Sequence, residues 1–477
     1  MDNKPDIKQP ENKKNLSNSK LSQSRVTAFQ VLSLAKREEC SIRHAINKLI
    51  AITKIDEKDK KYAIKLSLGV EQMKLTLDEV IFSCLNKNNK VKFKTITILR
   101  IATFELLYLG KEPYVAVDQG VELAAKYTPY SKSFCNFVLH RIAEKKEGFP
   151  YGNPDTDKSA FCRLFSIQPW IYDYFKEDIG RDMTRNILSN CNGQPPLYIF
   201  VNPLKTTVDD IFKKLEDCGA GPEVVNAING IELKFCIWVK KLYLLNNQIL
   251  NELCNEGYII ISDAAAQAVA SFALSFYLHD DYPHTMLEVC SGSGNKTIML
   301  QSLIHDKFNK FTQLTTLDDK EYKTNNLLDR VKKCNLEVFK THIQDATKID
   351  SESLGTFSHV FVDAPCSGLG TIRRHPEIKW RIKPEIIDNL ASKGLEILKQ
   401  ASKCVEVGGF LTYSVCTITN KETVDVIAKF LQSFEGQDFV VSKFMGKREV
   451  ASYYTTQTQL CLFDNHFACQ LKRVEKQ

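Results

Sequence analysis

The spacing of apolar residues changes along the chain, and each change predicts a domain boundary. Over residues 25–146 apolar side chains recur every three to four positions, the period of an amphipathic helix. We therefore expect an all-helical domain there. Residues 1–24 hold too few apolar groups to offset the entropy of ordering, which predicts a disordered lead. A segment dense in Gly, Pro, Asn and Asp at 147–157 predicts a linker.

The rest of the chain mixes strand and helix signals. Residues 158–256 predict a small α+β domain, with a strand at 197–201 and a helix at 207–215. Over residues 257–473 short apolar runs alternate with helical segments, the pattern of an α/β fold with a Rossmann-like, doubly wound sheet. The expected strands lie at 286–289, 314–317, just before Asp345, 357–362 and, as the last strand, 409–415.

Reactive side chains follow directly after several of these strands. Asp318 ends one strand, Asp363 and Cys366 follow another, and Cys416 follows the last. The carboxyl ends of parallel strands meet at one edge, where ligands bind, so these groups should line one crevice. Asp318 is placed to accept hydrogen bonds from ribose hydroxyls, with a helix cap as the alternative.

A glycine-containing loop follows the strand at 286–289. It reads Cys290-Ser291-Gly292-Ser293-Gly294-Asn295-Lys296-Thr297. A Gly-x-Gly loop alone could serve a dinucleotide or make a tight turn. With Glu288 before it, E-V-C-S-G-S-G approximates the E-x-G-x-G-x-G pattern of S-adenosylmethionine-dependent methyltransferases. A carboxylate beside the loop would repel a pyrophosphate but tolerate a sulfonium.

Composition narrows the class of protein. No apolar run approaches the length of a membrane span, and the amino terminus has no secretory pattern, so we expect a cytoplasmic protein that does not enter a membrane. Fifteen cysteines without a C-x-x-C pair indicate reduced thiols and no metal site. We expect a monomer. The net charge of +7 suits an anionic partner.

Two basic stretches are candidates for contact with RNA. The first, residues 86–100, contains five basic side chains and no acid, and charge alone favours a solvated surface and an RNA-facing patch equally. The second surrounds Trp380, a composition suited to phosphates and a stacked base. Its basic residues are Arg373, Arg374, His375, Lys379, Arg381 and Lys383.

Two cysteines at the ligand-binding edge suggest a reaction. Taken singly, Cys366 and Cys416 would each be a packing residue. Taken together beside a methyl donor, they fit methylation of cytosine C5, a carbon that becomes nucleophilic only after a thiolate adds to C6. The second thiol can then help remove the C5 proton and eject the first.

Several motifs are similar to those of the NOL1/NOP2/Sun family of RNA cytosine-C5 methyltransferases. D-A-P-C-S followed by I-R-R-H-P-E-I-K-W is highly specific, and P-Y-V-A-V-D-Q-G-V-E-L-A resembles the NusB-like RNA-binding domain found in this family. I-S-D-A-A-A-Q and D-N-H-F-A-C-Q-L extend the match over about residues 25–473. The resemblance implies S-adenosylmethionine as cofactor and a cytosine of 16S rRNA as substrate.

The resemblance also implies a role for individual residues. Cys416 would be the nucleophile, Cys366 the release cysteine, and Asp363 a group beside donor and cytosine. Lys296 would contact cytosine or phosphate and favour thiolates. The implied donor site comprises Cys290, Ser291, Gly292, Ser293, Gly294, Asn295, Lys296, Asp318 at the ribose, Asp345 at the adenine, and Asp363.

The chain departs from the family pattern at several positions. Ser293 and Asn295 replace a proline and a glycine of the donor loop, which predicts weaker donor binding. Val415 and Thr417 flank the nucleophile in place of Thr and Ser, and Phe200 replaces an arginine. Two alternatives follow: a catalytically degenerate RNA-binding relative, and a dinucleotide-dependent oxidoreductase, which would leave both cysteines unexplained.

Overall fold

The computed structural model describes residues 21–50, 52–85, 90–241, 247–277, 283–442, 453–455 and 462–475. The chain divides into two compact units, Met1–Pro169 and Trp170–Gln477. Most of the lead predicted to be disordered at 1–24 lies outside the described residues. Its last two residues, Gln23 and Ser24, already belong to the first helix.

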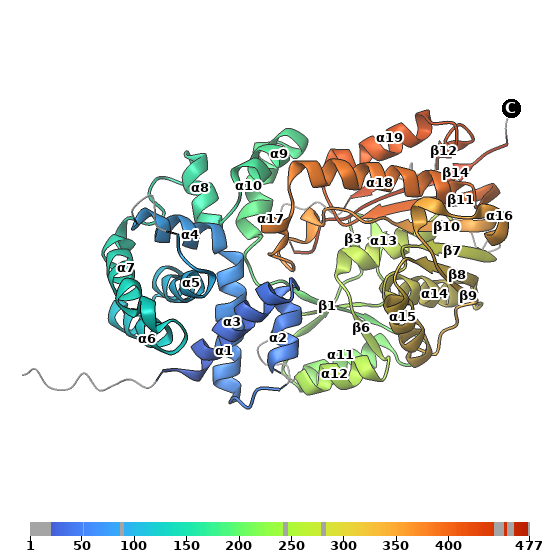
Figure 1. Cartoon of the computed structure of the whole chain (residues 1–477). Helices are drawn as coiled ribbons and strands as arrows, with labels where there is room; N and C mark the ends of the chain where they lie inside the picture. Colours follow the sequence, from blue (N-terminus) through green and yellow to red (C-terminus); the bar gives the residue numbers. More distant parts are fainter. Residues whose placement is uncertain are drawn as a thin grey trace, which may run out of the picture. The chain divides into compact units, whose positions relative to one another are not determined.

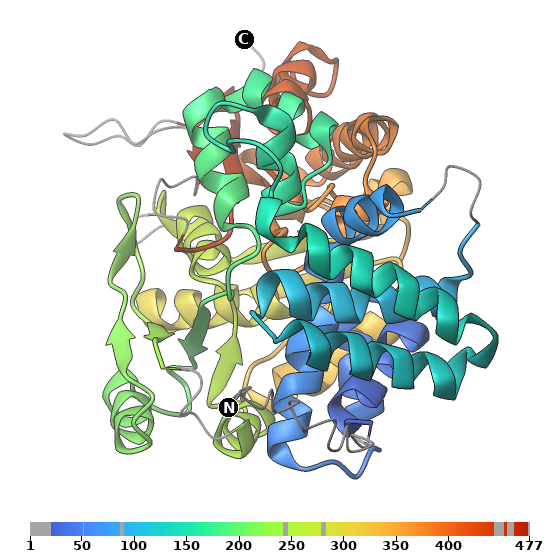
Figure 2. The ribbon, with the colours of Figure 1, turned by 90° about the vertical axis from the view of Figure 1, so that its left-hand side faces the viewer.

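The first unit is all-helical, and Figure 2 shows its blue-to-teal helices gathered into one bundle. At its centre α5 buries Ile98, Ile101, Ala102 and Leu106, the face that the periodicity predicts. The helices are α1 (Gln23–Arg37), α2 (Ile42–Ile50), α3 (Glu57–Gln72), α4 (Lys74–Ser83), α5 (Phe93–Tyr108), α6 (Pro113–Tyr127), α7 (Lys132–Lys145) and α8 (Lys158–Phe165), with 3-10 turns η1 (Pro129–Ser131) and η2 (Lys146–Gly148).

The segment predicted as a linker, 147–157, lies inside this first unit. Helix α8 follows it and packs on α4, where Arg163 forms an ion pair with Glu79 at 2.7 Å. The backbone N–H of Thr76 also donates to Ser166 Oγ at 3.3 Å. Composition predicted a linker between domains here, but it could not show that the chain folds back onto the same unit.

The second unit begins with helices and a four-stranded antiparallel sheet of order β2-β5-β1-β6. The strand predicted at 197–201 is β1. Strand β6 lies beyond the predicted end of the small domain at 256, yet Ile261 pairs with Ile199 of β1. The elements are α9 (Pro169–Ile179), α10 (Arg181–Asn190), β1 (Leu197–Val201), α11 (Val208–Asp217), β2 (Pro222–Val224), β3 (Ala227–Ile228), β4 (Ile231–Glu232), β5 (Cys236–Val239), α12 (Asn247–Asn255) and β6 (Ile259–Ile261).

The larger sheet confirms the predicted Rossmann-like fold. Its order is β12-β14-β11-β10-β7-β8-β9, with β13 paired to β14. The strands from β11 to β9 are parallel, whereas β14 runs antiparallel to β11, so the strand at 409–415 is not the last. The strands are β7 (Thr285–Val289), β8 (Gln313–Asp318), β9 (Lys340–Ile343), β10 (Phe357–Asp363), β11 (Val405–Val415), β12 (Phe439–Val441), β13 (Tyr453–Thr455) and β14 (Phe467–Arg473).

Helices cover both faces of this sheet (Figure 1). Alternate residues of β10 divide between the faces: Val360 and Val362 pack with α18 and α19, and Phe361 packs with α13, α14 and α15. The helices and turns are α13 (Ala264–Leu274), α14 (Asn295–Phe308), α15 (Glu321–Lys333), η4 (Ala346–Lys348), α16 (Ser351–Leu354), η5 (Leu369–Thr371), α17 (Ile378–Arg381), α18 (Pro384–Ser402), η6 (Asn420–Glu422) and α19 (Val424–Gln432). Among the described residues, no helix has the length and apolar character needed to cross a membrane.

Candidate active site

The parallel register brings the predicted reactive residues to one edge of the larger sheet. Val289 of β7 pairs with Leu317 of β8 and Val362 of β10, and Asp363 pairs with Ser414 of β11. The carboxyl ends of β7, β8, β10 and β11 therefore lie side by side along one edge of the sheet. The residues that follow these ends, which the sequence placed at a common crevice, come from four neighbouring strands.

A pocket of about 310 Å³ lies at this edge, at the small end of the usual range for ligand sites of roughly 300–1,000 Å³. Four of the predicted donor-binding residues line it: Cys290, Asp318, Asp345 and Asp363. Residues 291–296 are not among its lining residues. The remaining lining residues are Asp319, Lys320, Lys323, Ala346, Pro365, Lys393 and Ile397.

Sequence reasoning missed the pocket residues contributed by helices. Lys323 belongs to α15, and Lys393 and Ile397 belong to α18. A lysine on an amphipathic helix has the same sequence signature whether it faces solvent or a pocket. Only the packing of α18 on the sheet shows that these side chains reach the crevice.

The loop after β7 makes a tight turn in which both glycines, Gly292 and Gly294, have positive φ. Gly294 has φ +84, and a Cβ there would lie 2.8 Å from Leu327 Cγ. The two positions that depart from the family pattern are accommodated: Asn295 is exposed at the start of α14, and the carbonyl of Ser293 accepts a hydrogen bond from Arg330 Nη1 at 2.7 Å. Neither side chain lines the pocket.

Asp318 both lines the pocket and holds the loop. Its Oδ2 accepts from the backbone N–H of Gly292 at 2.9 Å, and its Oδ1 accepts from the N–H of Lys320 at 3.1 Å. The N-cap residue of α15 is Lys320, so Asp318 is not the helix cap weighed as the alternative. Asp345 caps η4 by accepting from Thr347, and these hydrogen bonds lower its pKa. Aspartate oxygens are hydrogen-bond acceptors that suit the hydroxyl and amino groups of a nucleoside.

Glu288 does not have the position that the loop pattern suggested. It is fully buried, its Oε2 accepts from Thr297 Oγ1 at 2.6 Å, and it does not line the pocket. Burial raises the pKa of this carboxyl to about 8. Its carboxyl group therefore packs beneath the loop, protonated at neutral pH, and offers no charge to a sulfonium.

An ion pair joins the loop helix to the end of β10. Lys296 Nζ lies 2.6 Å from Asp363 Oδ2, and Ser414 Oγ donates to Asp363 Oδ1 at 3.3 Å. Burial acts to lower the pKa of Lys296, but the neighbouring charges of Asp363 and Cys416 outweigh it and leave the pKa raised. A lysine cation is therefore fixed beside Cys416.

The two predicted cysteines are in contact. Cys366 Sγ lies 3.4 Å from Cys416 Sγ, although 50 residues separate them in sequence. The hydrogen bond to Cys416 raises the pKa of Cys366 well above its usual value, and burial and the charge of Cys416 add to this. The contact with Cys416 therefore makes Cys366 harder to ionise. Cys290, which was predicted to belong to the donor loop, also ionises with difficulty, because burial raises the pKa of its thiol to about 12.

Two members of the basic cluster around Trp380 are engaged inside the protein, so they do not belong to the expected nucleic-acid surface. Arg374 donates to Asp464 Oδ2 at 2.7 Å and pairs with Asp263 as well. Lys379 is fully buried, and its Nζ donates to Asn192 Oδ1 at 2.8 Å. These cations join the segments that precede β1, α13 and β14 to the loop that follows Cys366. The exposed members are His375, Arg381 and Lys383.

The other basic stretch, 86–100, is also partly engaged. Lys87 lies outside the described residues. Arg100 donates to both oxygens of Asp78 at 2.6 and 2.7 Å, so its charge is neutralised within the helical unit. The two interpretations of this stretch stay open for its described lysines.

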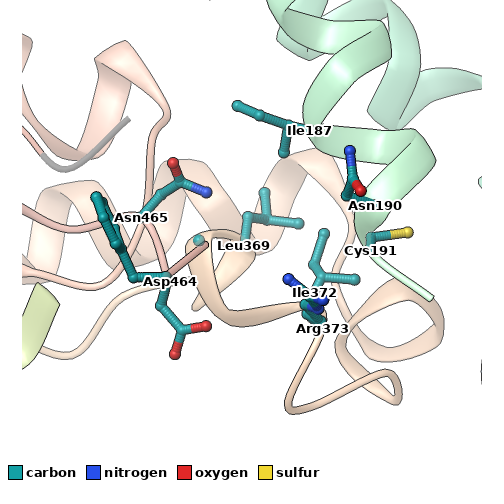
Figure 3. Close-up of a pocket in the computed structure, with 10 residues that line it drawn as sticks. Ile187, Asn190, Cys191, Leu369, Ile372, Arg373, Asp464 and Asn465 are labelled. Atoms are coloured by element: carbon teal, nitrogen blue, oxygen red, sulfur yellow. The ribbon is translucent and has the colours of Figure 1, made fainter. Parts of the chain in front are cut away.

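A small cavity lies behind the cysteine loop, between α10 and the segment 369–373 (Figure 3). Ile187 and Cys191 line one side, and Leu369, Arg373 and Asp464 line the other. Its volume of about 30 Å³ is comparable to the space of one water molecule. This hollow is too small for a substrate.

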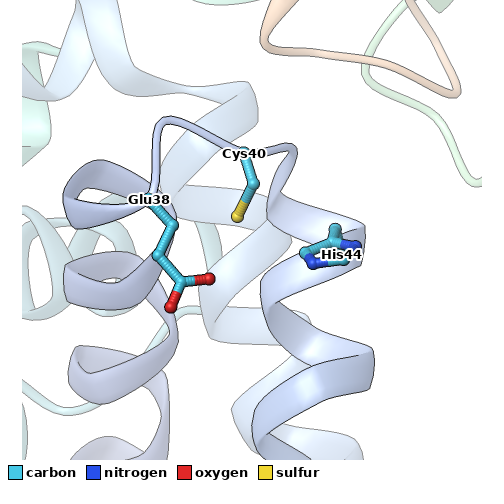
Figure 4. A group of neighbouring side chains, drawn as sticks. All are labelled: Glu38, Cys40 and His44. Carbon is cyan, nitrogen blue, oxygen red and sulfur yellow. The ribbon is translucent and has the colours of Figure 1, made fainter. Parts of the chain in front are cut away.

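Within the described residues, one group of side chains has the composition of a metal site: Glu38, Cys40 and His44, at the turn between α1 and α2 (Figure 4). Both carboxylate oxygens of Glu38 already accept from Lys48 Nζ, at 2.9 and 2.8 Å. This ion pair occupies the only carboxylate of the group, so we assign no metal to these three side chains.

Three family models match the chain in succession. The NusB family matches residues 22–144, the ferredoxin-like domain of RsmF/B-like methyltransferases matches 168–236, and the 16S rRNA methyltransferase RsmB/F family matches 276–466. The fold and the pocket thus define a methyltransferase whose cofactor is S-adenosylmethionine. The three models match in this order along most of the chain, so the chain is similar in domain architecture to the RsmB/F methyltransferases.

Individual relatives span nearly the whole chain. The probable ribosomal RNA small subunit methyltransferase B of Bacillus subtilis is 26% identical over 428 residues, which cover 88% of this chain and 90% of the relative. The protein of the same name from Synechocystis is 26% identical over 418 residues, covering 86% and 90%.

Solved structures show the same fold. The crystal structure of PH0851 matches with a TM-score of 0.74 at 20% identity and covers 94% of this chain and 99% of that chain. NSun6 from Pyrococcus horikoshii with SFG matches with a TM-score of 0.50 at 14% identity, covering 64% and 98%. The monomeric state, the cytoplasmic location and the domain boundaries stay predictions.

Proposed function

We propose that this protein transfers a methyl group from S-adenosylmethionine to C5 of a cytosine in 16S ribosomal RNA, through a covalent bond between Cys416 and C6. The 3.4 Å contact between Cys366 and Cys416 carries the proposal. Asp363 is linked to the cysteine pair through its ion pair with Lys296, and it also lines the donor pocket. The thiol and the methyl group would therefore meet at one place. The names of the relatives support ribosomal RNA as the substrate, and the helical unit would bind the same RNA.

Residues of this chain would orient the reactants. Asp318 would accept hydrogen bonds from ribose hydroxyls, and Asp345 would face the adenine. When bound, S-adenosylmethionine supplies an electrophilic methyl group. The Lys296 cation favours a thiolate at Cys416, which adds to C6 of cytosine and forms a carbon–sulfur bond. The electron pair of the C5–C6 double bond then becomes available at C5 to accept the methyl group.

Release would begin with a change in Cys366. Its pKa is raised chiefly by the hydrogen bond to Cys416 and also by the charge of that thiol. Once Cys416 is bonded to carbon it carries no charge, so Cys366 becomes more acidic and loses its proton to solvent. The Cys366 thiolate then removes the C5 proton. The C5–C6 double bond forms again, and Cys416 leaves as a thiolate.

Trapping the adduct tests this division of roles. Cys366→Ala should still attack and methylate RNA but remain bonded to it, giving a protein–RNA band that survives denaturing electrophoresis. Cys416→Ser should form no band and transfer no methyl group, because a hydroxyl is largely protonated and a far poorer nucleophile. Cys404→Ala is the matched control, since Cys404 is buried in the same unit away from the strand edge, and it should behave as the wild type.

The possible outcomes separate the alternatives. A band with Cys416→Ala and none with Cys366→Ala would mean that the two roles are exchanged. Activity in both single variants would show that the thiols only pack, and the mechanism would be wrong. A wild-type protein that binds RNA but neither binds the donor by calorimetry nor methylates RNA would be the degenerate relative.

A further inference from the structure

We propose that Glu422 is the positioning residue that holds the two cysteine loops together and places its carboxyl group beside Cys366. This inference rests on the proposed function, because it names the residue that keeps the two thiols close enough for that reaction. Glu422 lies in η6, six residues after Cys416, and no sequence motif singled it out. A buried acid in a polar segment gives the same pattern as an exposed one.

The carboxylate of Glu422 bonds to both cysteine loops. Its Oε1 accepts from the backbone N–H of Ser367, and its Oε2 accepts from Ser367 Oγ, both at 2.6 Å. Ser367 directly follows Cys366. On the other loop Thr417, which directly follows Cys416, donates from Oγ1 to Oε2 at 3.2 Å, and Thr419 donates at 2.7 Å. One carboxylate therefore fixes the residue after each thiol.

This network is almost completely shielded from water. Glu422 is 1% exposed, Thr417 and Thr419 are fully buried, and Ser367 is 3% exposed. Ser367 Oγ also lies 3.0 Å from Thr417 Oγ1, which joins the loops directly. Hydrogen bonds to a buried carboxylate are among the stronger ones, so this contact defines the separation of the loops.

Further contacts anchor the same assembly to its surroundings. Tyr413 O–H donates to the carbonyl of Glu422 at 3.0 Å, and the N–H of Asn420 donates to Asp178 Oδ2 of α9 at 2.8 Å. The N–H of Gly370 donates to the carbonyl of Cys416 at 3.1 Å. Glu422 is thus the centre of a rigid support rather than a surface acid.

The charge of Glu422 acts on the thiols unequally. It is one of the causes that raise the pKa of Cys366, after the contact with Cys416 and burial. Lys296 acts from the other side, next to Cys416. A negative charge near Cys366 therefore disfavours the ionisation of that thiol. The charged or titratable groups around the pair are Lys296 of α14, Asp363 of β10, Tyr413 of β11, Glu422 of η6 and His466 before β14.

Two variants test the proposal in the full-length protein. Glu422→Gln keeps the shape but removes the charge and replaces one acceptor oxygen by a donor, whereas Glu422→Asp keeps the charge. We expect Glu422→Gln to lower the single-turnover rate of RNA methylation on the order of 10- to 100-fold, the value of one charge-assisted hydrogen bond, with donor affinity unchanged. Glu422→Asp should recover part of that rate. Glu406→Gln, at an exposed position of the same unit, is the matched control.

A second readout needs neither RNA nor donor. The rates at which iodoacetamide alkylates Cys366 and Cys416 are measured by mass spectrometry as a function of pH. In Glu422→Gln the profile of Cys366 should move to lower pH, because an opposing negative charge is gone. Superimposable alkylation profiles in the wild type and Glu422→Gln, or equal rates of methylation, would overturn the proposal. If the wild-type protein and Glu422→Gln differ in the pH dependence of Cys366 alkylation as expected, but the wild-type protein does not methylate RNA, the proposed function is refuted instead.

Discussion

Removing the Arg374 guanidinium should destabilise the second unit strongly. This side chain bridges two buried carboxylates, Asp263 and Asp464, whose side chains are 5% and 7% exposed. It also donates to the carbonyl of Pro196 at 2.9 Å. Arg374→Ala would leave both acids buried without their cation. Breaking a buried pair in this way costs about 3 to 5 kcal/mol of unfolding free energy.

The chain offers a convenient assay for this loss. All three tryptophans, Trp170, Trp238 and Trp380, belong to the second unit, so their fluorescence follows its unfolding alone. With a urea m-value on the order of 3 kcal/mol/M, the expected loss moves the midpoint down by about 1 to 1.7 M. Circular dichroism, which also includes the helical unit, would show a separate transition that keeps its midpoint.

Two comparisons make the result decisive. Arg381→Ala removes an exposed arginine of the same segment and should change the stability by no more than about 0.5 kcal/mol. Asp464 has a pKa raised to about 7, first by burial and then by the charge of Asp263, so Asp464→Asn should be tolerated better than the loss of Arg374. A midpoint shift below about 0.3 M for Arg374→Ala would refute the view that this guanidinium satisfies the buried acids.

Two further predictions concern the donor site and the carboxyl beneath it. Asp318→Ala should weaken S-adenosylmethionine binding by about 1 to 3 kcal/mol in calorimetry, and unchanged affinity would remove Asp318 from the site. Glu288 has a pKa of about 8 in the folded protein against an ordinary value of 4.5, so between these pH values the folded state holds a proton that the unfolded state has lost, and stability falls as pH rises. Glu288→Gln should flatten this decline in urea midpoints measured between pH 5 and 8.5, and an equal slope in both proteins would contradict the buried, protonated state.

Local patterns in the sequence were enough to predict the elements that carry the site. The apolar runs at 286–289, 314–317 and 357–362 are strands, because short β-branched and aromatic segments suit a sheet buried on both faces. The rule that ligands bind at the carboxyl ends of parallel strands then placed Asp318, Asp363 and the two cysteines together. That reasoning needed only the order of residues along each strand.

Tertiary structure alone decided which charged residues serve the site and which support it. Arg374 and Lys379 have the composition of an RNA surface, yet they are turned inward, because buried acids and an amide on segments far away in sequence pair with them. Glu422 and Lys393 gave no signal, since a charged residue on a helix or turn has the same sequence pattern whether it is buried or solvated. The sequence by itself determined the fold class and predicted that the two cysteines share one edge of the sheet. The partners of each charge depend on long-range contacts, and only the folded chain brings those together.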